Sequence, residues 1–216
     1  MARESGNTRS FSILFLLLAF TLLVPMANAS ILGVGGTAPP SPLFPTGTQL
    51  AFTSGTITTP TFSTDYSTWV LSDPTNTWCA NCLDFVYQFT NNGPDVNQRY
   101  TMSSFSGFNV DAGTDPFGVH DPITVSRSTL NGGQVISFNF DQFGDEIQPG
   151  TTTVWLVIET DARSFTSGFV SAQDGTAGSG SAFAPTVPEP SSLVLMGSGL
   201  IAAGGLLRKS RFGKRS

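Results

Sequence analysis

Apolar and polar residues alternate with a period of two along much of the middle of the chain. Residues 83–90 (LDFVYQFT) and 136–141 (ISFNFD) place apolar side chains at every second position, the pattern of a strand with one buried face. Residues 154–158 (VWLVI) are apolar throughout, which predicts a strand at the centre of a sheet with Trp155 in the core. Weaker alternation predicts further strands, at residues 49–52, 66–71, 99–105, 123–127 and 165–171.

Turn-forming residues separate these segments, as at 92–94 (NGP) and 131–133 (NGG). Short alternating segments with turns between them are typical of an all-β domain, and no helical period runs through the middle of the chain. We therefore expect one antiparallel β-sandwich over residues 48–173. The ten residues 86–95 (VYQFTNNGPD) also resemble a strand and turn common in bacterial surface immunoglobulin-like modules. This resemblance implies an immunoglobulin-like sandwich and carries no catalytic motif.

Two segments of different composition border the predicted domain. Residues 30–47 are rich in glycine and proline and are expected to form a loose arm or an edge segment. Residues 174–187 (DGTAGSGSAFAPTV) contain mostly small residues, which predicts a flexible linker.

The N-terminus has the pattern of a secretory signal. Two arginines precede an apolar run at 11–24, and Ala27 and Ala29 provide the small residues of a cleavage site before Ser30. This pattern predicts a signal peptide over residues 1–29, and therefore export through the Sec machinery. A retained N-terminal anchor is less favoured, because the apolar run is shorter than the roughly 20 residues that a membrane span needs.

A second apolar stretch lies near the C-terminus. Residues 191–207 are predicted to form a transmembrane helix, and the segment 208–216 that follows is basic. Arg208, Lys209 and Arg211 form the basic stop that keeps this end in the cytoplasm by the positive-inside rule. The topology then places the middle of the chain outside the cytoplasm.

The residues just before this span carry a recognisable motif. Pro188, Glu189 and Pro190 lead into the apolar stretch and its basic end. This three-part tail, 188–216 preceded by Val187, resembles the PEP-CTERM sorting signal of exported proteins in Gram-negative bacteria. The resemblance implies an exosortase-type membrane protease as a partner and an association with exopolysaccharide. It also implies that the span anchors the chain in the inner membrane only in transit, before the product reaches the cell envelope, surface or medium.

Charge is sparse and unevenly distributed. Charged residues make up 12% of the chain, against about 25% in average globular proteins. Residues 30–190 hold three arginines, no lysine and fourteen acids, a formal charge of 3 − 14 = −11. An acidic region of this kind repels phosphate backbones, which excludes an electrostatic nucleic-acid binder.

The cysteine pair is the most conspicuous candidate for chemistry. Cys79 and Cys82 lie in the sequence WCANC, which resembles the thioredoxin redox motif. In that motif a helix N-terminus lowers the thiol pKa, but here the second cysteine precedes the strand pattern at 83–90. We therefore expect a structural disulfide in an oxidising compartment. A thiol oxidoreductase is the weaker alternative.

Acidic residues offer a second candidate, a calcium site. They lie in the sequences 111–121 (DAGTDPFGVHD) and 141–146 (DQFGDE), without the spacing of a known calcium loop. Aspartate before proline or glycine is also ordinary turn chemistry. His120 is the single histidine, and no GxSxG motif accompanies it. We expect no catalytic residues, no metal and no cofactor.

Aromatic residues offer a third candidate, a surface on which sugars stack. Strand alternation assigns most aromatic rings to the core, so Trp78, in a predicted loop, is the one tryptophan expected to be available for stacking. The interpretation that these observations favour is an exported, non-catalytic protein of the cell envelope or extracellular matrix. A glycan- or calcium-binding adhesin module is the alternative.

Overall fold

The computed structural model describes residues 31–115, 120–141 and 144–186. The predicted signal peptide with its cleavage site (Ala27, Ala29, Ser30), the sorting motif, the span at 191–207 and the basic tail lie outside these residues. Within the described part of the chain, no helix has the length and apolar character needed to span a membrane.

Two six-stranded sheets make up the described part of the chain. In the first sheet all neighbours are antiparallel except the short edge strand β2, which runs parallel to β7. Its strands lie in the order β2 (Ser41–Pro42), β7 (Val110–Thr114), β10 (Leu156–Thr160), β5 (Cys82–Pro94), β4 (Phe62–Asp73), β3 (Thr48–Thr58).

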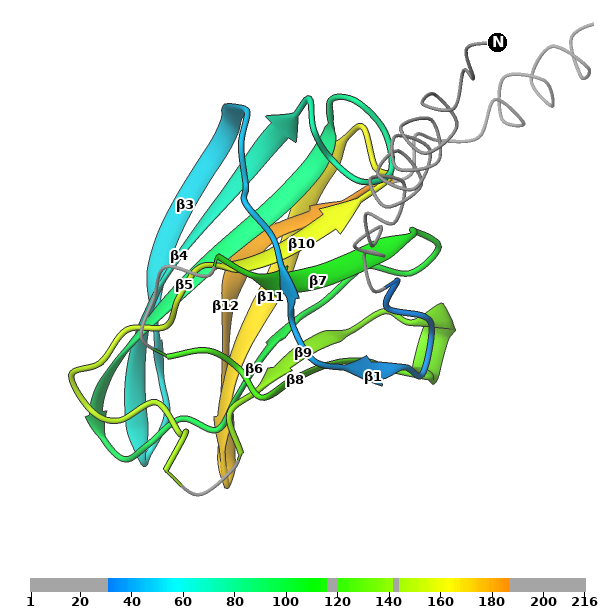
Figure 1. The fold of residues 1–216 in the computed structure, drawn as a ribbon. Helices are drawn as coiled ribbons and strands as arrows, with labels where there is room; N and C mark the ends of the chain where they lie inside the picture. Colours follow the sequence, from blue (N-terminus) through cyan, green and yellow to red (C-terminus); the bar gives the residue numbers. More distant parts are fainter. Residues whose placement is uncertain (1–30, 116–119, 142–143, 187–216) are drawn as a thin grey trace, which may run out of the picture.

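The second sheet is antiparallel throughout. A single 3₁₀ turn, η1 (Leu130–Gly132), connects two of its neighbours. Its strands lie in the order β1 (Thr37–Ala38), β8 (Thr124–Arg127), β9 (Ile136–Asn139), β6 (Arg99–Met102), β11 (Phe165–Asp174), β12 (Thr176–Pro185). The two sheets form the two layers of the domain (Figure 1). The predicted all-β class is thus confirmed.

One hydrophobic core lies between the sheets. Phe85, Tyr87 and Phe89 of β5 point inward and are fully buried, as the alternation at 83–90 predicts. From the other sheet, Tyr100 of β6 stacks on Phe89 with ring centroids 4.0 Å apart, and Phe138 of β9 is also fully buried. These contacts join the two layers as a sandwich does.

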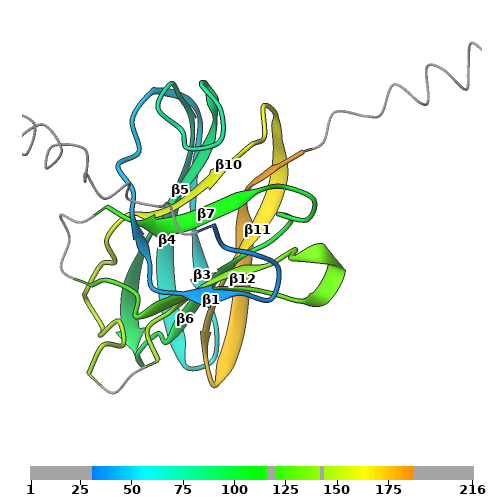
Figure 2. The ribbon, with the colours of Figure 1, turned by 45° about the vertical axis from the view of Figure 1, so that its right-hand side comes forward.

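The segment 30–47 contributes more structure than the prediction of an arm implies. Its strand β1 pairs with β8 in one sheet and its strand β2 pairs with β7 in the other, so it bridges the two layers (Figure 2). Leu32 and Leu43 are buried. Burial of these two leucines keeps the segment on the domain despite its glycines and prolines, and both strands are sheet edges, where proline is tolerated.

The prediction of a linker at 174–187 is wrong for the described residues, because residues 176–185 form strand β12. All ten residues of β12 pair with β11, and Ala182 and Ala184 are buried. The small residues that suggested a linker let the strand approach its neighbours closely. A side chain at Gly180 would meet the ring of Tyr66, whose hydroxyl donates to the Ser181 carbonyl at 2.9 Å.

Candidate functional site

Cys79 and Cys82 form a disulfide in the loop between β4 and β5, with their Cα atoms 5.3 Å apart. Cys82 is the first residue of strand β5, and its amide donates to the Cys79 carbonyl at 3.0 Å. The same loop is held by Asn76, whose side-chain oxygen accepts from the amide of Trp78 at 2.8 Å. Because a strand follows the pair, no helix dipole acts on Cys79, in contrast to the thioredoxin arrangement.

The acidic residues proposed for calcium do not converge. Asp111 is buried on β7, whereas Asp141 forms a partly exposed ion pair with Arg99 at 3.6 Å. Glu146 accepts from the amide of Gly144 at 2.8 Å. His120 is partly buried, and its carbonyl accepts from the amide of Val154 at 3.3 Å. Among the residues that the structure describes, no group of three or more His, Cys, Asp or Glu is placed to hold a metal ion.

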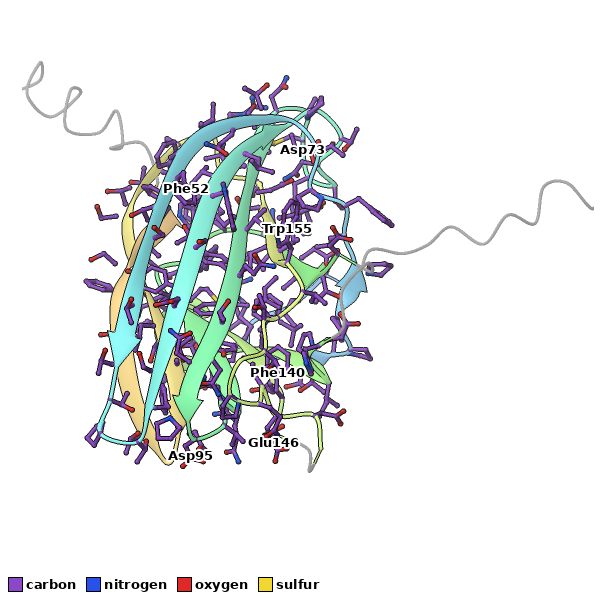
Figure 3. The ribbon with its side chains drawn as sticks, turned by 90° about the vertical axis from the view of Figure 1, so that its left-hand side faces the viewer. Phe52, Asp73, Asp95, Phe140, Glu146 and Trp155 are labelled. Carbon is purple, nitrogen blue, oxygen red and sulfur yellow. A yellow bond between two sulfur atoms is a disulfide. The ribbon has the colours of Figure 1, made fainter. Side chains whose placement is uncertain are left out.

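Sequence reasoning missed a row of carboxylates on the outer face of the first sheet. Asp84 of β5 lies opposite Glu159 of β10, and Glu159 lies opposite Asp111 of β7. We call these three residues the carboxylate row. Each is at most 5% exposed. Asp73, at the end of β4, is also buried and borders this row; Figure 3 marks its position.

Neighbouring loops cover the carboxylate row. Asn76 Nδ2 donates to Asp84 at 2.7 Å, and the hydroxyl of Ser41, from β2, donates to Asp111 at 3.0 Å. The backbone amide of Thr77 donates to Glu159 at 3.1 Å. The row is therefore closed off from solvent by the β4–β5 loop and by the segment that carries β2.

Burial changes the protonation of this cluster. Burial, a side-chain hydrogen bond with Asp73 and the charge of Glu159 raise the pKa of Asp84 to about 9. Burial would also raise the pKa of Asp73, but hydrogen bonds that include those from Thr75 and Asp84 hold it below its usual range. Asp84 therefore keeps its proton at neutral pH and donates it to Asp73. Asp84 Oδ2 is buried and accepts no hydrogen bond, so it is the oxygen available to carry this proton.

Aromatic side chains form a second row on the same outer face. Phe52 of β3 lies opposite Trp69 of β4, with ring centroids 5.4 Å apart, and Trp69 lies 6.0 Å from Trp155. We call these three residues the aromatic row. Figure 3 labels its two ends, Phe52 and Trp155, with β4 and β5 between them.

The structure corrects the expectation that Trp155 belongs to the core. Trp155 is 40% exposed, because it immediately precedes β10 and points to the outer face of the sheet. Trp78, expected to be the available tryptophan, is only partly exposed, and its indole nitrogen is buried. The most exposed tryptophan of the described residues therefore lies on the sheet and not in the loop.

Comparisons with known proteins concern the C-terminal tail. No curated protein and no solved structure matches the chain. A family model described as the PEP-CTERM protein-sorting motif matches residues 186–209, as the residues Pro188, Glu189 and Pro190 predicted. The chain therefore carries a PEP-CTERM protein-sorting motif, which indicates an exported protein of the cell envelope that is sorted by an exosortase.

Proposed function

We propose that this chain is a non-catalytic envelope or matrix protein whose described β domain is delivered outside the cell and then released from its tail. In this proposal Sec export removes residues 1–29, the span at 191–207 holds the chain in the inner membrane, and an exosortase-type protease processes the tail. The observation that carries the proposal is the sorting motif at residues 186–209. In this proposal the released product lies among exopolysaccharide outside the cell.

The position of the motif relative to the fold supports this role. Strand β12 ends at Pro185, and the motif begins at the next residue. Thr186 is itself held on the domain, because its amide donates to the Ser164 carbonyl and its carbonyl accepts from the Ser164 hydroxyl, both at 3.0 Å. Processing after residue 186 therefore leaves every described strand in the product.

The absence of catalysis is part of the proposal and rests on the chemistry of the described residues. The buried carboxylate row is covered by loops and shares a proton with Asp73, so it offers no open pair of acid and base to a substrate. The cysteines are joined to each other in a disulfide, so neither is a free thiol.

The immunoglobulin-like class of the sandwich also remains a proposal. It is supported by the resemblance of residues 86–95 to a strand and turn of bacterial surface immunoglobulin-like modules.

The intact mass of the protein recovered from the envelope and medium of its host tests this function. We expect a product that begins at Ser30, ends after Thr186 and is lighter by two hydrogens for the disulfide. A chain with Pro188, Glu189 and Pro190 replaced by alanine is the matched control, and should keep its tail.

Two results would contradict the proposal. If the recovered chain still ends at Ser216, the tail is a permanent anchor. If the product ends before residue 185, processing removes part of β12, and the described fold is not that of the mature protein.

A further inference from the structure

We propose that the outer face of the first sheet binds a linear, neutral polysaccharide, with the aromatic row as the stacking surface. The inference deepens the proposed function, because export is what brings this face into contact with extracellular glycans. It rests on three features of the described residues: the exposure and spacing of the rings, the polar groups beside them, and the charge of the face.

The aromatic row is a continuous strip that is open to solvent. Phe52 is 50% exposed and Trp155 is 40% exposed, while Trp69 between them is half-buried. Adjacent rings are tilted by 43° and 40°. Trp69 packs against Val86 and Val157, which are buried on the outer face of the sheet. This packing holds the middle ring in place, while the two end rings stay partly open to solvent, as stacking on a ligand requires.

A band of hydroxyl and amide groups runs beside the aromatic row. Ser67 lies opposite both Ser54 of β3 and Gln88 of β5, and all three lie on the same face as Trp69. Gln88 is held by donating to the Thr153 carbonyl at 3.2 Å. A sugar ring has an apolar C–H face and a rim of hydroxyls, so an aromatic strip with a neighbouring polar band matches both of its surfaces.

The negative charge of the domain favours a neutral glycan over an acidic one. The next band beyond these residues contains Asp65, an exposed carboxylate that accepts from Thr56 at 2.6 Å. Acids outnumber arginines fourteen to three over residues 30–190. A polysaccharide that carries uronic acids or sulfates would be repelled by this field, whereas a neutral chain would not.

The shape of the apolar surface disfavours a protein partner. The aromatic row is narrow, with the polar band on one side and, on the other, Leu71 followed by the covered carboxylate row. Stable protein interfaces bury about 800 Å² on each partner around an apolar core. A narrow strip that crosses the strands from Phe52 at the sheet edge to Trp155 near its centre fits an extended chain instead.

Binding of defined oligosaccharides to the protein purified from its host tests this inference. The probes are cellohexaose, mannohexaose and chitohexaose, with a galacturonic acid hexamer as the acidic comparison. Two of the three tryptophans of the chain belong to the aromatic row, so ligand binding can be followed by tryptophan fluorescence and by calorimetry. We expect at least one neutral probe to bind and the acidic probe not to bind.

Substitutions of single aromatic residues test where the oligosaccharide binds. Trp155→Ala should weaken binding about tenfold, the effect of removing one aromatic anchor, and Trp155→Phe should restore most of the affinity. Phe169→Ala is the matched control, because Phe169 is 61% exposed but lies on β11 in the other sheet; it should leave binding unchanged. Thermal unfolding of each variant checks that the fold is retained.

Three outcomes would overturn the inference. The first is that no neutral probe binds, and the second is that Trp155→Ala binds as well as the unchanged chain. The third is a dimer that becomes monomeric in the Phe52→Ala and Trp155→Ala variants, which would make this face an interface between copies. The mass test of tail processing is independent of all three, so failure here leaves the sorting proposal standing.

Discussion

Asp84 of β5 lies directly opposite Glu159 of β10, and both carboxylates are buried on the outer face of a sheet, under a loop. Two like charges in this position would repel each other strongly, since burial removes the water that screens them. The cluster avoids this cost because Asp84 retains a proton at neutral pH. The proton is then a structural component of the fold, and the stability of the domain depends on pH.

Stability should fall as pH rises from about 4 towards about 9. Asp84 has a pKa of about 9 in the folded chain and an ordinary value near 3.9 when unfolded, so the folded state binds the proton more tightly. Its contribution is complete below the unfolded pKa and is lost as pH rises towards 9, by at most about 1.4 kcal/mol per pH unit. The pKa of Asp111, raised by burial to about 6, adds to this slope only below pH 6. Chemical denaturation at pH 6, 7 and 8 measures the slope.

Asp84→Asn should flatten this dependence. The amide oxygen can accept from Asn76 as Asp84 does, and the amide nitrogen can donate to Asp73 in place of the proton. We expect the variant to equal the unchanged chain near pH 6 and to be more stable at pH 8. Asp141→Asn, at an exposed position, is the control and should keep the original slope. Equal slopes in both variants would show that Asp84 does not carry the proton.

Arg127 should contribute strongly to stability although it lies on β8 in the second sheet and belongs to neither row. It is only 6% exposed, and its guanidinium donates to four carbonyls, those of Gly133, Leu32, Phe105 and Phe108, at 2.9–3.2 Å. Arg127→Met keeps the volume but leaves buried acceptors without donors, which should cost about 3 kcal/mol.

Urea denaturation measures this loss. Arg127→Lys should recover only part of it, because an ammonium cannot reproduce the planar arrangement of donors. Arg163→Met, at an exposed position, should change the free energy of unfolding by less than about 0.5 kcal/mol. A similar small effect for Arg127→Met would mean that its hydrogen bonds are replaced by water.

The sequence predicted those strands whose one face is apolar and whose other face is polar. β5 and β9 follow this pattern, and the core side chains they were expected to provide are buried. β7 was missed because its sequence VDAGT reads as turn chemistry. Its Asp111 is buried through contacts with Ser41 and Ala112, and those contacts depend on a chain crossing that no local pattern encodes.

The two rows on the outer face could not be predicted for the same reason. The carboxylate row combines β5, β10 and β7, and the aromatic row combines β3, β4 and the residue before β10. Register between strands that are distant in the sequence is set by the whole sheet. Trp155 illustrates the consequence: an apolar run indicates a central strand correctly, but does not say that one ring remains exposed.

The thiol of Cys79 should behave as an unactivated cysteine once the disulfide is reduced. Cys82 opens strand β5, so no helix N-terminus stabilises a thiolate, and Cys79 should react slowly with alkylating agents at neutral pH. The rate of iodoacetamide alkylation in the Cys82→Ser variant measures this reactivity. Rapid alkylation at neutral pH, together with insulin reduction by the unchanged chain, would support the thiol oxidoreductase alternative.

Strand β12 gives a direct test of where the domain ends. A Cβ atom at Gly180 would lie 2.5 Å from the ring of Tyr66, so Gly180→Val forces either the ring or the strand to move, at a cost of about 1–3 kcal/mol. Ser179→Val, at the adjacent exposed position, should cost little, because valine suits a strand. A flexible linker would tolerate both substitutions equally. Thermal unfolding of the two variants therefore decides whether residues 176–185 belong to the fold, and a loss confined to Gly180→Val is the expected result.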